Sequence, residues 1–449
     1  MKTTTTRTSC AALAGLALFA APVATHAATY AKTATVTAPG VPADVTLSDF
    51  PLLIRLSTAI SGFDYGDFQG TDGSDLRFED ASGNALAYEV DTWNPQGESL
   101  VWVKVPSLTA AIEITMRWGS ANPDANDPTA VWSNYVGVWH GNDFACATGG
   151  DYPASPLPAA DGYTLSSARA DHLGSAFFNE NTATGTRIKL GTAAKNPAAA
   201  LTAVSQLTVS AWVKSASTTP SVRLFSNKVA YGDNGFELLA VSGSGFLLRG
   251  NGTSAQAGWW TGGYQDLKSQ NWTHIAATID GSAGTMFVNG ATYSGTVAAP
   301  TDVGSQGVAF GGYSADTNKY SPLTGFADEI RIYNGVPAAA YLVAEHAQVV
   351  TSGYVVVGAV GDTAQDVPDI AAAPTVVRNA NGTYTIGASV TGVAGYAYNL
   401  EIQLYGTAAW TDVWTPAAGS ETRTVFWTTD ANVADGTYQA AFLATAPSG

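Results

Sequence analysis

Hydrophobic and polar residues alternate with a period of two along most of this chain. The clearest stretches are Leu100–Val105 and Glu113–Trp118, where every second side chain is apolar. Successive side chains of a strand point to opposite faces of a sheet, so this period indicates strands with one buried face. Clusters of Gly, Asn, Asp and Pro separate the stretches, as antiparallel connections require. The pattern predicts an all-β protein of tandem β-sandwich or jelly-roll domains rather than βαβ units. The further alternating stretches are Leu207–Lys214, Ile275–Asp280, Leu400–Tyr405 and Tyr438–Leu443.

One segment has helical character, and a second has the composition of a linker. Pro337–His346 starts with a proline suited to the first helical turn and is rich in Ala, Leu and Glu. Gly361–Pro374 is polar and rich in Ala and Pro. We therefore expect boundaries near residues 133 and 362. They separate a β domain at 28–133, a second at 134–361, a linker at 362–374 and a β-sandwich at 375–449.

The first 27 residues have the features of a secretory signal peptide. Lys2 and Arg7 precede the apolar stretch Ala11–Ala24, and small residues lead up to a cleavage site after Ala27. We expect the mature protein to be secreted into the medium or held at the cell surface. Cys146 is then its sole cysteine, so no intramolecular disulfide can form. No later apolar run approaches the roughly 18 residues of a membrane span.

Charge excludes one large class of partners. The chain has 36 acidic and 20 basic residues, a net charge of −16, and removal of Lys2 and Arg7 would make it more acidic still. A surface of that sign repels polyanions, so we expect no nucleic-acid partner and no binding to anionic membranes. Charged residues make up only 12% of the sequence. A surface built largely from Thr, Ser, Asn and aromatic residues suits neutral sugars better.

The N-terminal β region resembles a known domain family. Phe50–Trp118 contains FPLLIRL, DFQGTDGSDLRFEDASGN, YEVDTW and SLVWVKVP. These segments are similar to the bacterial domain of unknown function DUF2341. The resemblance implies a β-rich domain of an exported multidomain protein, and that family has no agreed activity.

The central region is similar to the concanavalin A-like, laminin-G-like jelly roll. The matching segments are LTVSAWVKS at Leu207–Ser215, NWTHIAATIDGSAGTMFVNG at Asn271–Gly290 and LTGFADEIRIYNGVPAAAYLVAEH at Leu323–His346. The similarity extends over about 136–350. The tail from Pro374 to Gly449 loosely resembles an immunoglobulin- or fibronectin-type sandwich, through NGTYTI and DGTYQAAFLAT.

No catalytic set emerges from the sequence. The chain lacks HExxH, GxSxG, a phosphate-binding loop and cysteine pairs with metal spacing. Glu89–Asn94 reads ExDxxN, which differs from the glycanase pattern ExDxxE by an amide in place of the last acid. It also lies in the DUF2341-like region rather than the jelly roll. We interpret it as an ordinary strand with its polar face in solvent.

A structural calcium ion is the cofactor that the jelly-roll resemblance implies. In Asp328–Tyr333, a period of two places Asp328 on the same side as Ile330 and Ile332. A carboxylate on an apolar face needs backbone hydrogen bonds or a cation. In jelly rolls of this kind, an acid near the closing strand often belongs to a calcium site that ties the first and last strands together. We therefore expect Asp328 and Asp143 as oxygen ligands of Ca²⁺, with a backbone-capping role for Asp328 as the alternative.

An aromatic loop is the strongest local sign of a ligand platform. Trp259, Trp260 and Tyr264 lie among glycines, and Asn251 and Asp266 are near them in sequence. Aromatic rings bind the apolar faces of sugars, while amides and carboxylates bind the hydroxyls. We predict that these five residues bind a ligand; the alternative is that the tryptophans cover the core.

The sequence as a whole favours an exported, noncatalytic binding or adhesion protein. Its jelly roll would recognise a glycan or another extracellular surface ligand. Two other functions stay open: a polysaccharide hydrolase or lyase whose carboxylates come from distant strands, and a structural protein that assembles the cell envelope through sheet edges. The oligomeric state is open as well.

Overall fold

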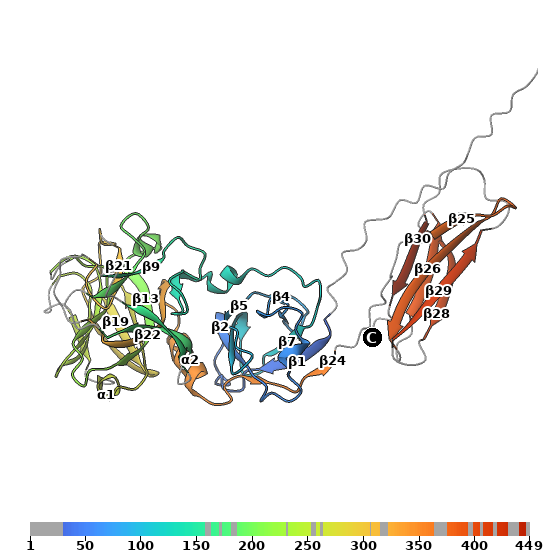
Figure 1. Cartoon of the computed structure of the whole chain (residues 1–449). Coiled ribbons are helices and arrows are strands. Elements are labelled where there is room, and N and C mark those ends of the chain that lie inside the picture. Colours follow the sequence, from blue (N-terminus) through green and yellow to red (C-terminus); the bar gives the residue numbers. More distant parts are fainter. Residues whose placement is uncertain are drawn as a thin grey trace, which may run out of the picture. The chain divides into compact units, whose positions relative to one another are not determined.

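The structure is a computed structural model of the whole chain (Figure 1). It divides into a large compact unit, Lys32–Gly361, and a unit formed by the residues from Asp362 on. Among the described residues, no helix has the length and hydropathy that a membrane crossing requires. The described residues are 30–449 except 158–162, 170–172, 181–185, 230–231, 253–256, 261–263, 306, 315–321, 363–374, 394–397, 405–406, 416–419, 430–439 and 446–449. The expected signal peptide and almost all of the expected linker therefore lie outside them.

The N-terminal β domain consists of two antiparallel sheets. The larger has the order β23-β1-β7-β3-β4, and the smaller has the order β2-β6-β5. The predicted strand Glu113–Trp118 is β7, and Leu100–Val105 lies within β6. The elements are β1 (Lys32–Thr37), β2 (Leu47–Leu56), η1 (Tyr65–Asp67), β3 (Arg77–Glu79), β4 (Ala85–Leu86), β5 (Tyr88–Thr92), β6 (Ser99–Leu108), β7 (Glu113–Trp118), η2 (Pro128–Trp132), β23 (Val356–Val357) and β24 (Gly361–Asp362).

The jelly roll is a sandwich of two larger sheets. One has the order β10-β11-β22-β13-β18-β19-β20, with β8 also paired to β22, and the other has the order β17-β16-β15-β14-β21-β12-β9. Its elements are β8 (Tyr135–Trp139), β9 (Ala154–Leu157), β10 (Thr164–Arg169), β11 (Gly174–Asn179), β12 (Arg187–Leu190), η3 (Pro197–Ala200), β13 (Gln206–Ser215), β14 (Val222–Ser226), β15 (Glu237–Val241), β16 (Gly245–Arg249), β17 (Ala257–Trp260), α1 (Tyr264–Lys268), β18 (Thr273–Asp280), β19 (Ala283–Val288), β20 (Ala291–Thr296), β21 (Val308–Phe310) and β22 (Gly325–Asn334).

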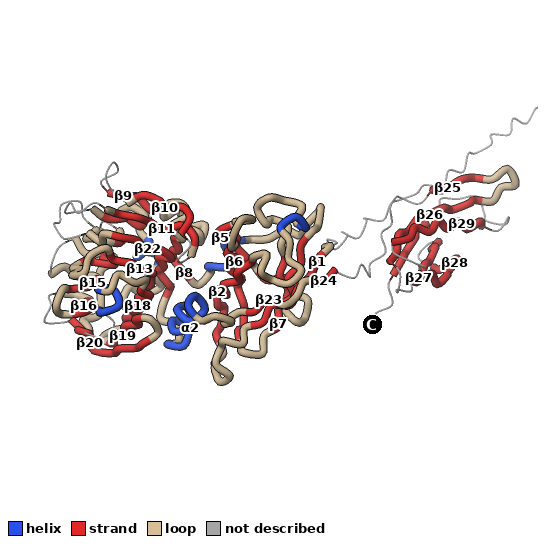
Figure 2. The backbone as a smooth tube through the Cα atoms, turned by 60° about the horizontal axis from the view of Figure 1, so that its bottom comes forward, coloured by secondary structure: helices blue, strands red, loops and turns tan. Residues whose placement is uncertain are grey.

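Helix α2 (Ala339–Val350) joins the jelly roll to the N-terminal domain. It starts two residues after the predicted Pro337 and continues past His346 to Val350. Figure 2 shows it between the sheets of the two domains. The Gln348 side chain accepts a hydrogen bond from Leu53 N at 2.9 Å and donates one to Pro51 O at 3.3 Å, both on strand β2. This side chain takes the place of a neighbouring strand at the edge of the β2-β6-β5 sheet.

The boundary expected near residue 133 lies inside a continuous hydrophobic core. On one face of strand β13, Val209, Ala211 and Val213 pack in the jelly-roll core. On the other face, Trp212 packs with the N-terminal domain. After α2 the chain returns to that domain, where β23 pairs with β1. The two β domains therefore bury one shared surface and form one compact unit. The boundary expected near 362 coincides with the division between the two units.

The C-terminal unit contains two three-stranded antiparallel sheets, with the orders β25-β26-β29 and β28-β27-β30. This arrangement is a β-sandwich, as the alternating pattern predicts. The strands are β25 (Thr375–Arg378), β26 (Tyr384–Val393), β27 (Tyr398–Leu404), β28 (Thr407–Trp414), β29 (Ser420–Thr428) and β30 (Ala440–Thr445).

We predict that Gln348→Ala lowers the free energy of unfolding of the large unit by about 2 kcal/mol. The change removes two buried hydrogen bonds and leaves two backbone groups of β2 without partners. Urea unfolding of the chain without its first 27 residues measures the difference, and Gln69→Ala, at an exposed position, serves as the control. Equal midpoints for the two variants would contradict a stabilising role for Gln348.

Candidate functional site

A β-bulge in strand β22 shapes the surface between the two β domains. Ser210 pairs with Arg331 and Trp212 with Asp328, so one residue of β13 faces two residues of β22. Glu329, at the bulge, has a φ of 49°. The extra residue shifts the alternation, and Asp328 shares the face of Trp212. The expectation that Asp328 shares the face of Ile330 and Ile332 is therefore wrong, because a strict period of two does not allow for a bulge.

His140 lies just beyond strand β8 and connects carboxylates of both domains. Its Nδ1 is 2.7 Å from Glu329 Oε1, and its Nε2 is 3.2 Å from Glu89 Oε2 on β5. The Trp132 indole N–H also donates to Glu89. Burial opposes a charge on His140, but the carboxylates of Glu329, Glu89 and Asp91 outweigh it and raise the pKa of His140 well above its usual value.

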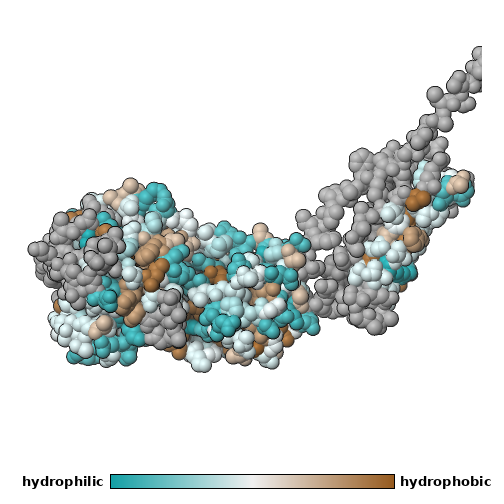
Figure 3. All heavy atoms as spheres, in the orientation of Figure 1, coloured by the Kyte–Doolittle hydropathy of each residue, from teal (hydrophilic) through white to brown (hydrophobic). Residues whose placement is uncertain are grey.

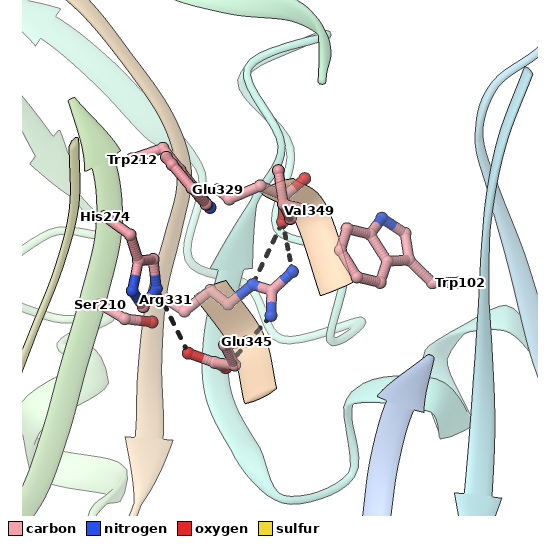
Figure 4. A pocket seen from close by; sticks show the side chains of 8 residues that line it. All are labelled: Trp102, Ser210, Trp212, His274, Glu329, Arg331, Glu345 and Val349. Carbon is pink, nitrogen blue, oxygen red and sulfur yellow. Dashed lines mark hydrogen bonds and ion pairs between the residues drawn. The ribbon is translucent and has the colours of Figure 1, made fainter. Parts of the chain in front are cut away.

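Arg331 is the second cation of this cluster (Figure 4). Its Nε and Nη2 donate to Glu329 Oε2 at 3.1 and 2.7 Å, and its Nη1 donates to Glu345 Oε1 at 3.2 Å. The guanidinium carbon is 4.6 Å from the ring centroid of Trp102. Burial alone would raise the pKa of Glu329, but His140 and Arg331 lower it to about 2. Glu329 is therefore ionised over the whole physiological range.

A small cavity adjoins this ion pair. It has a volume of about 10 Å³, and the side chains drawn in Figure 4 surround it: Trp102, Ser210, Trp212, His274, Glu329, Arg331, Glu345 and Val349. That volume is enough for about one water molecule. No sugar ring fits there, so these acids cannot act on a polysaccharide in this arrangement.

Asp91, on strand β5, brings a further carboxylate to His140. Its Oδ1 accepts a hydrogen bond from Asn142 Nδ2 at 2.8 Å, whereas its Oδ2 is buried and accepts none of normal geometry, with the Trp102 side chain close to the carboxylate. Burial, followed by the negative charges of Glu329 and Glu89, raises the pKa of Asp91 to about 7, although His140 counteracts this. Glu89 and Asp91 are only partly exposed and face a buried histidine. The interpretation of Glu89–Asn94 as a strand with its polar face in solvent is therefore wrong for these two residues.

Asp91, His140 and Glu329 are the one group of three or more candidate metal ligands in the part of the chain that the structure describes. One ligand atom from each lies within 4.8 Å of the other two. The expected calcium ligands are not in this group. Asp328 is fully buried, and its Oδ1 accepts from Glu329 N at 2.8 Å. Asp143 is exposed and accepts from Ala145 N at 2.7 Å. Calcium binding by Asp328 and Asp143 stays a prediction.

The predicted glycan-binding residues have internal partners wherever their side chains are described. The Tyr264 hydroxyl donates to Pro220 O at 2.6 Å, and Asp266 Oδ2 accepts from Asn289 Nδ2 at 3.0 Å. Asn251 Oδ1 accepts from the backbone N–H of Gly235 and of Thr301. Trp259 and Trp260 belong to β17, where they pair with Leu247 and Phe246 of β16. The side chains of both tryptophans lie outside the described part of the structure.

A groove at the rim of the jelly roll brings Tyr264 together with residues that the sequence did not single out. It has a volume of about 260 Å³ and is open to solvent. Tyr264, Gln265 and Lys268 of helix α1 form one wall. The other lining residues come from the β13–β14 and β15–β16 connections and the start of β16: Thr218, Thr219, Ser242, Gly243, Ser244 and Gly245. All of its polar side chains except that of Tyr264 belong to exposed residues.

The second jelly-roll sheet carries a separate buried charge cluster around Glu237. Glu237 Oε2 is 2.8 Å from Arg223 Nε, and its Oε1 is 3.1 Å from Arg249 Nε and 3.7 Å from Lys228 Nζ. Burial lowers the pKa of Lys228 to about 8, although Glu237 counteracts this. Arg223, Glu237 and Arg249 alternate with core residues on β14, β15 and β16, so the cluster lies on the sheet face opposite the core.

Two family models match the chain, and the first extends from the N-terminal β domain past strand β8 of the jelly roll. Residues 72–144 match DUF2341, a domain of unknown function. Residues 189–341 match the concanavalin A-like lectin/glucanases superfamily. The chain carries a DUF2341 domain followed by a concanavalin A-like domain. Both resemblances that the sequence motifs indicate are thereby confirmed. No curated protein matches the chain.

Solved structures similar to this chain include several sugar-binding domains. Domain 4 of AbnA, an extracellular arabinanase from Geobacillus stearothermophilus solved with arabinotriose, is 21% identical; the match covers 47% of this chain and 97% of that domain, with a TM-score of 0.35. The CBM40 of a Ruminococcus gnavus sialidase bound to α2,3-sialyllactose is 17% identical (36% and 94% covered, TM-score 0.30). A leech intramolecular trans-sialidase is 18% identical (46% and 32% covered, TM-score 0.31).

We predict that His346→Gln reduces the acid sensitivity of the large unit. Burial, followed by the charge of nearby His274, lowers the pKa of His346 to about 4. The unfolded chain therefore takes up this proton first as the pH falls through 6.5, and folding stability declines between pH 6.5 and 4. After allowance for partial exposure, the variant should lose about 1 kcal/mol less than the wild type between pH 7 and 4.5. Urea unfolding at the two pH values tests this, and identical losses would contradict it.

Proposed function

We propose that this chain is an exported, noncatalytic protein that binds glycans through its concanavalin A-like domain. The observation that carries the proposal is the solvent-open groove beside helix α1. Its volume of about 260 Å³ is slightly below the roughly 300–1,000 Å³ of common ligand pockets, which suits one or two sugar rings. Export rests on the signal-peptide features of the first 27 residues.

The groove offers the polar groups that sugar hydroxyls need. Gln265 can both donate and accept hydrogen bonds, and Lys268 adds an ammonium donor. Thr218, Thr219 and Ser244 contribute exposed hydroxyls from the opposite wall. These groups face solvent in the free protein, so a sugar replaces water without breaking an internal network.

Tyr264 gives the groove a fixed wall. Its hydroxyl donates to Pro220 O, and its ring contacts Phe246 edge-on with centroids 6.0 Å apart. Asp266 and Asn251 support the site indirectly, since Asp266 contacts Asn289 and Asn251 contacts the backbone of Gly235. The three predicted residues whose side chains are described thus have different roles: direct contact for Tyr264, and support for Asp266 and Asn251.

The lining of the groove disfavours a hydrolase or lyase. Glycoside hydrolysis commonly needs two carboxyl groups on either side of the scissile bond. None of the described residues that line the groove is acidic or a histidine. The acids gathered at the domain junction surround a space of about 10 Å³, which excludes a sugar. Binding without catalysis is the function that agrees with both sites.

The face of the large unit drawn in Figure 3 agrees with a neutral ligand. Hydrophilic and intermediate residues, in teal and white, cover most of that face, and brown apolar residues form small groups. A sugar, or a glycan displayed on a cell or matrix surface, is the class of partner that such a surface favours. The net charge of −16 opposes strongly anionic polymers.

We predict that the double variant Gln265→Ala/Lys268→Ala binds glycans at least tenfold more weakly than the wild type, a loss of about 1.4 kcal/mol. The mature chain is first screened on a broad glycan panel, and affinities for the glycans found are measured by calorimetry. Gln206→Ala/Lys195→Ala, at exposed positions that do not line the groove, is the matched control and should bind as the wild type does.

Two results would contradict the proposal in different ways. Failure of the wild type to bind any neutral or acidic glycan would overturn the function. Glycan binding that survives in the groove variant but disappears in Trp259→Ala or Trp260→Ala would place the site on strand β17 instead.

A further inference from the structure

We propose that Asp91, His140 and Glu329 bind a divalent metal ion at the junction of the DUF2341 domain and the concanavalin A-like domain. Their ligand atoms lie within 4.8 Å of one another and come from three elements: β5, the residue after β8, and β22. The site is separate from the glycan groove, and it does not depend on the proposed function.

The arrangement around His140 is that of a metal ligand with a supporting carboxylate. Nδ1 and Glu329 Oε1 are 2.7 Å apart, close to the roughly 3 Å between neighbouring ligand atoms when metal–ligand bonds are about 2.0–2.1 Å. The other nitrogen, Nε2, is 3.2 Å from Glu89 Oε2. The metal would replace the proton between Nδ1 and Glu329, which is released on binding. The Nε2–H then donates to Glu89, which fixes the ring orientation in the way that metal-bound histidines commonly require.

The two carboxylate oxygens of Glu329 contact different groups, Arg331 and His140. Its Oε2 accepts both hydrogen bonds from Arg331, so Arg331 holds the side chain in place. Its Oε1 is the atom nearest His140 Nδ1 and is the one that would reach the metal. The same carboxylate thus connects the buried ion pair to the metal site.

Asp91 provides the observation that separates this group from an ordinary cluster of acids. Its Oδ2 is buried and accepts no hydrogen bond of normal geometry, although Asn142 occupies Oδ1 and the Trp102 side chain lies close to the carboxylate. A buried carboxylate oxygen without a partner costs stability, and a metal ion is the partner that the adjacent His140 and Glu329 imply. Asp91 is the most exposed of the three residues, since His140 and Glu329 are buried.

The ligand set favours a first-row transition metal over calcium. One imidazole and two carboxylates form the mixed N/O set that Zn²⁺ accepts, and Mn²⁺ also accepts it, whereas Ca²⁺ prefers oxygen ligands alone. The ion would link strand β5 of the N-terminal β domain to the first and closing strands of the jelly roll, β8 and β22. It would cross-link an exported chain in which, without a signal peptide, Cys146 is the only cysteine.

The test uses the full mature chain, stripped with a chelator and dialysed into metal-free buffer. Calorimetric titration with Zn²⁺, and in parallel with Mn²⁺ and Ca²⁺, gives affinity and stoichiometry, and elemental analysis measures the metal retained after dialysis. We expect one Zn²⁺ per chain and a higher melting temperature in its presence. A wild-type chain that binds neither Zn²⁺ nor Mn²⁺ would overturn the proposal and leave a purely structural hydrogen-bond network.

Asp91→Asn is the decisive variant, because it keeps the shape of the side chain at a partly exposed position. We expect Zn²⁺ to bind it at least tenfold more weakly, with an unchanged circular dichroism spectrum. His140→Gln should lose binding too, but it is buried between two domains and can also impair folding. Asp143→Asn is the matched control and should bind Zn²⁺ like the wild type. Undiminished binding by Asp91→Asn, or loss of binding in Asp143→Asn alone, would contradict the assignment.

Discussion

The buried ion pair between Arg331 and Glu329 is the interaction on which the large unit depends. Both side chains are nearly inaccessible, so the attraction between them must offset a large desolvation cost. The structure offsets it with partners from several elements. Glu345 of α2 and the aromatic face of Trp102 contact Arg331, and His140 contacts Glu329. Removing any one of them leaves a buried charge incompletely compensated. Trp102 and Glu89 complete the cluster from the N-terminal domain, so separation of the two β domains would remove these contacts from Arg331 and His140.

The buried ion pair lies at the packed domain junction, away from the groove that is available to ligands. The junction is filled by large aromatic and charged side chains and has room for about one water. The groove beside α1 lies at the rim of the sandwich, and its side-chain donors and acceptors belong mainly to exposed connections. Ligand binding there disturbs no buried charge. A stable junction and an adaptable rim are compatible with one chain because they use different faces of the jelly roll.

The sequence predicted the parts of the fold that follow from local pattern. Alternation in Glu113–Trp118 and Leu207–Lys214 identified strands, because one face of each strand meets an apolar core. The proline at 337 marked the start of a helix to within two residues. The C-terminal boundary was visible in composition. Each of these features depends on residues close together in the chain.

The junction could not be predicted in the same way, because it depends on pairing between distant segments. The bulge at Glu329 exists only against β13, more than a hundred residues earlier, and it reverses the face that a regular alternation assigns to Asp328. Glu89 and Asp91 look like solvent-facing residues until His140 is placed beside them. The aromatic loop drew attention to Tyr264, but Gln265 and Lys268 carry no signal in the sequence, since a polar surface residue looks the same inside a groove and outside it.

Gln348 has a consequence for how such proteins evolve. By sequence, α2 closes the concanavalin A-like region, yet its glutamine bonds to a strand of the DUF2341 domain. A recombination event that exchanged one domain at the short connection between them would separate this side chain from the strand edge it covers. We expect a domain exchange to preserve stability only when α2 and strand β2 are inherited together, or when the incoming helix carries an amide at the position of Gln348. The two domains match different families, but this contact favours inheritance of both as one unit.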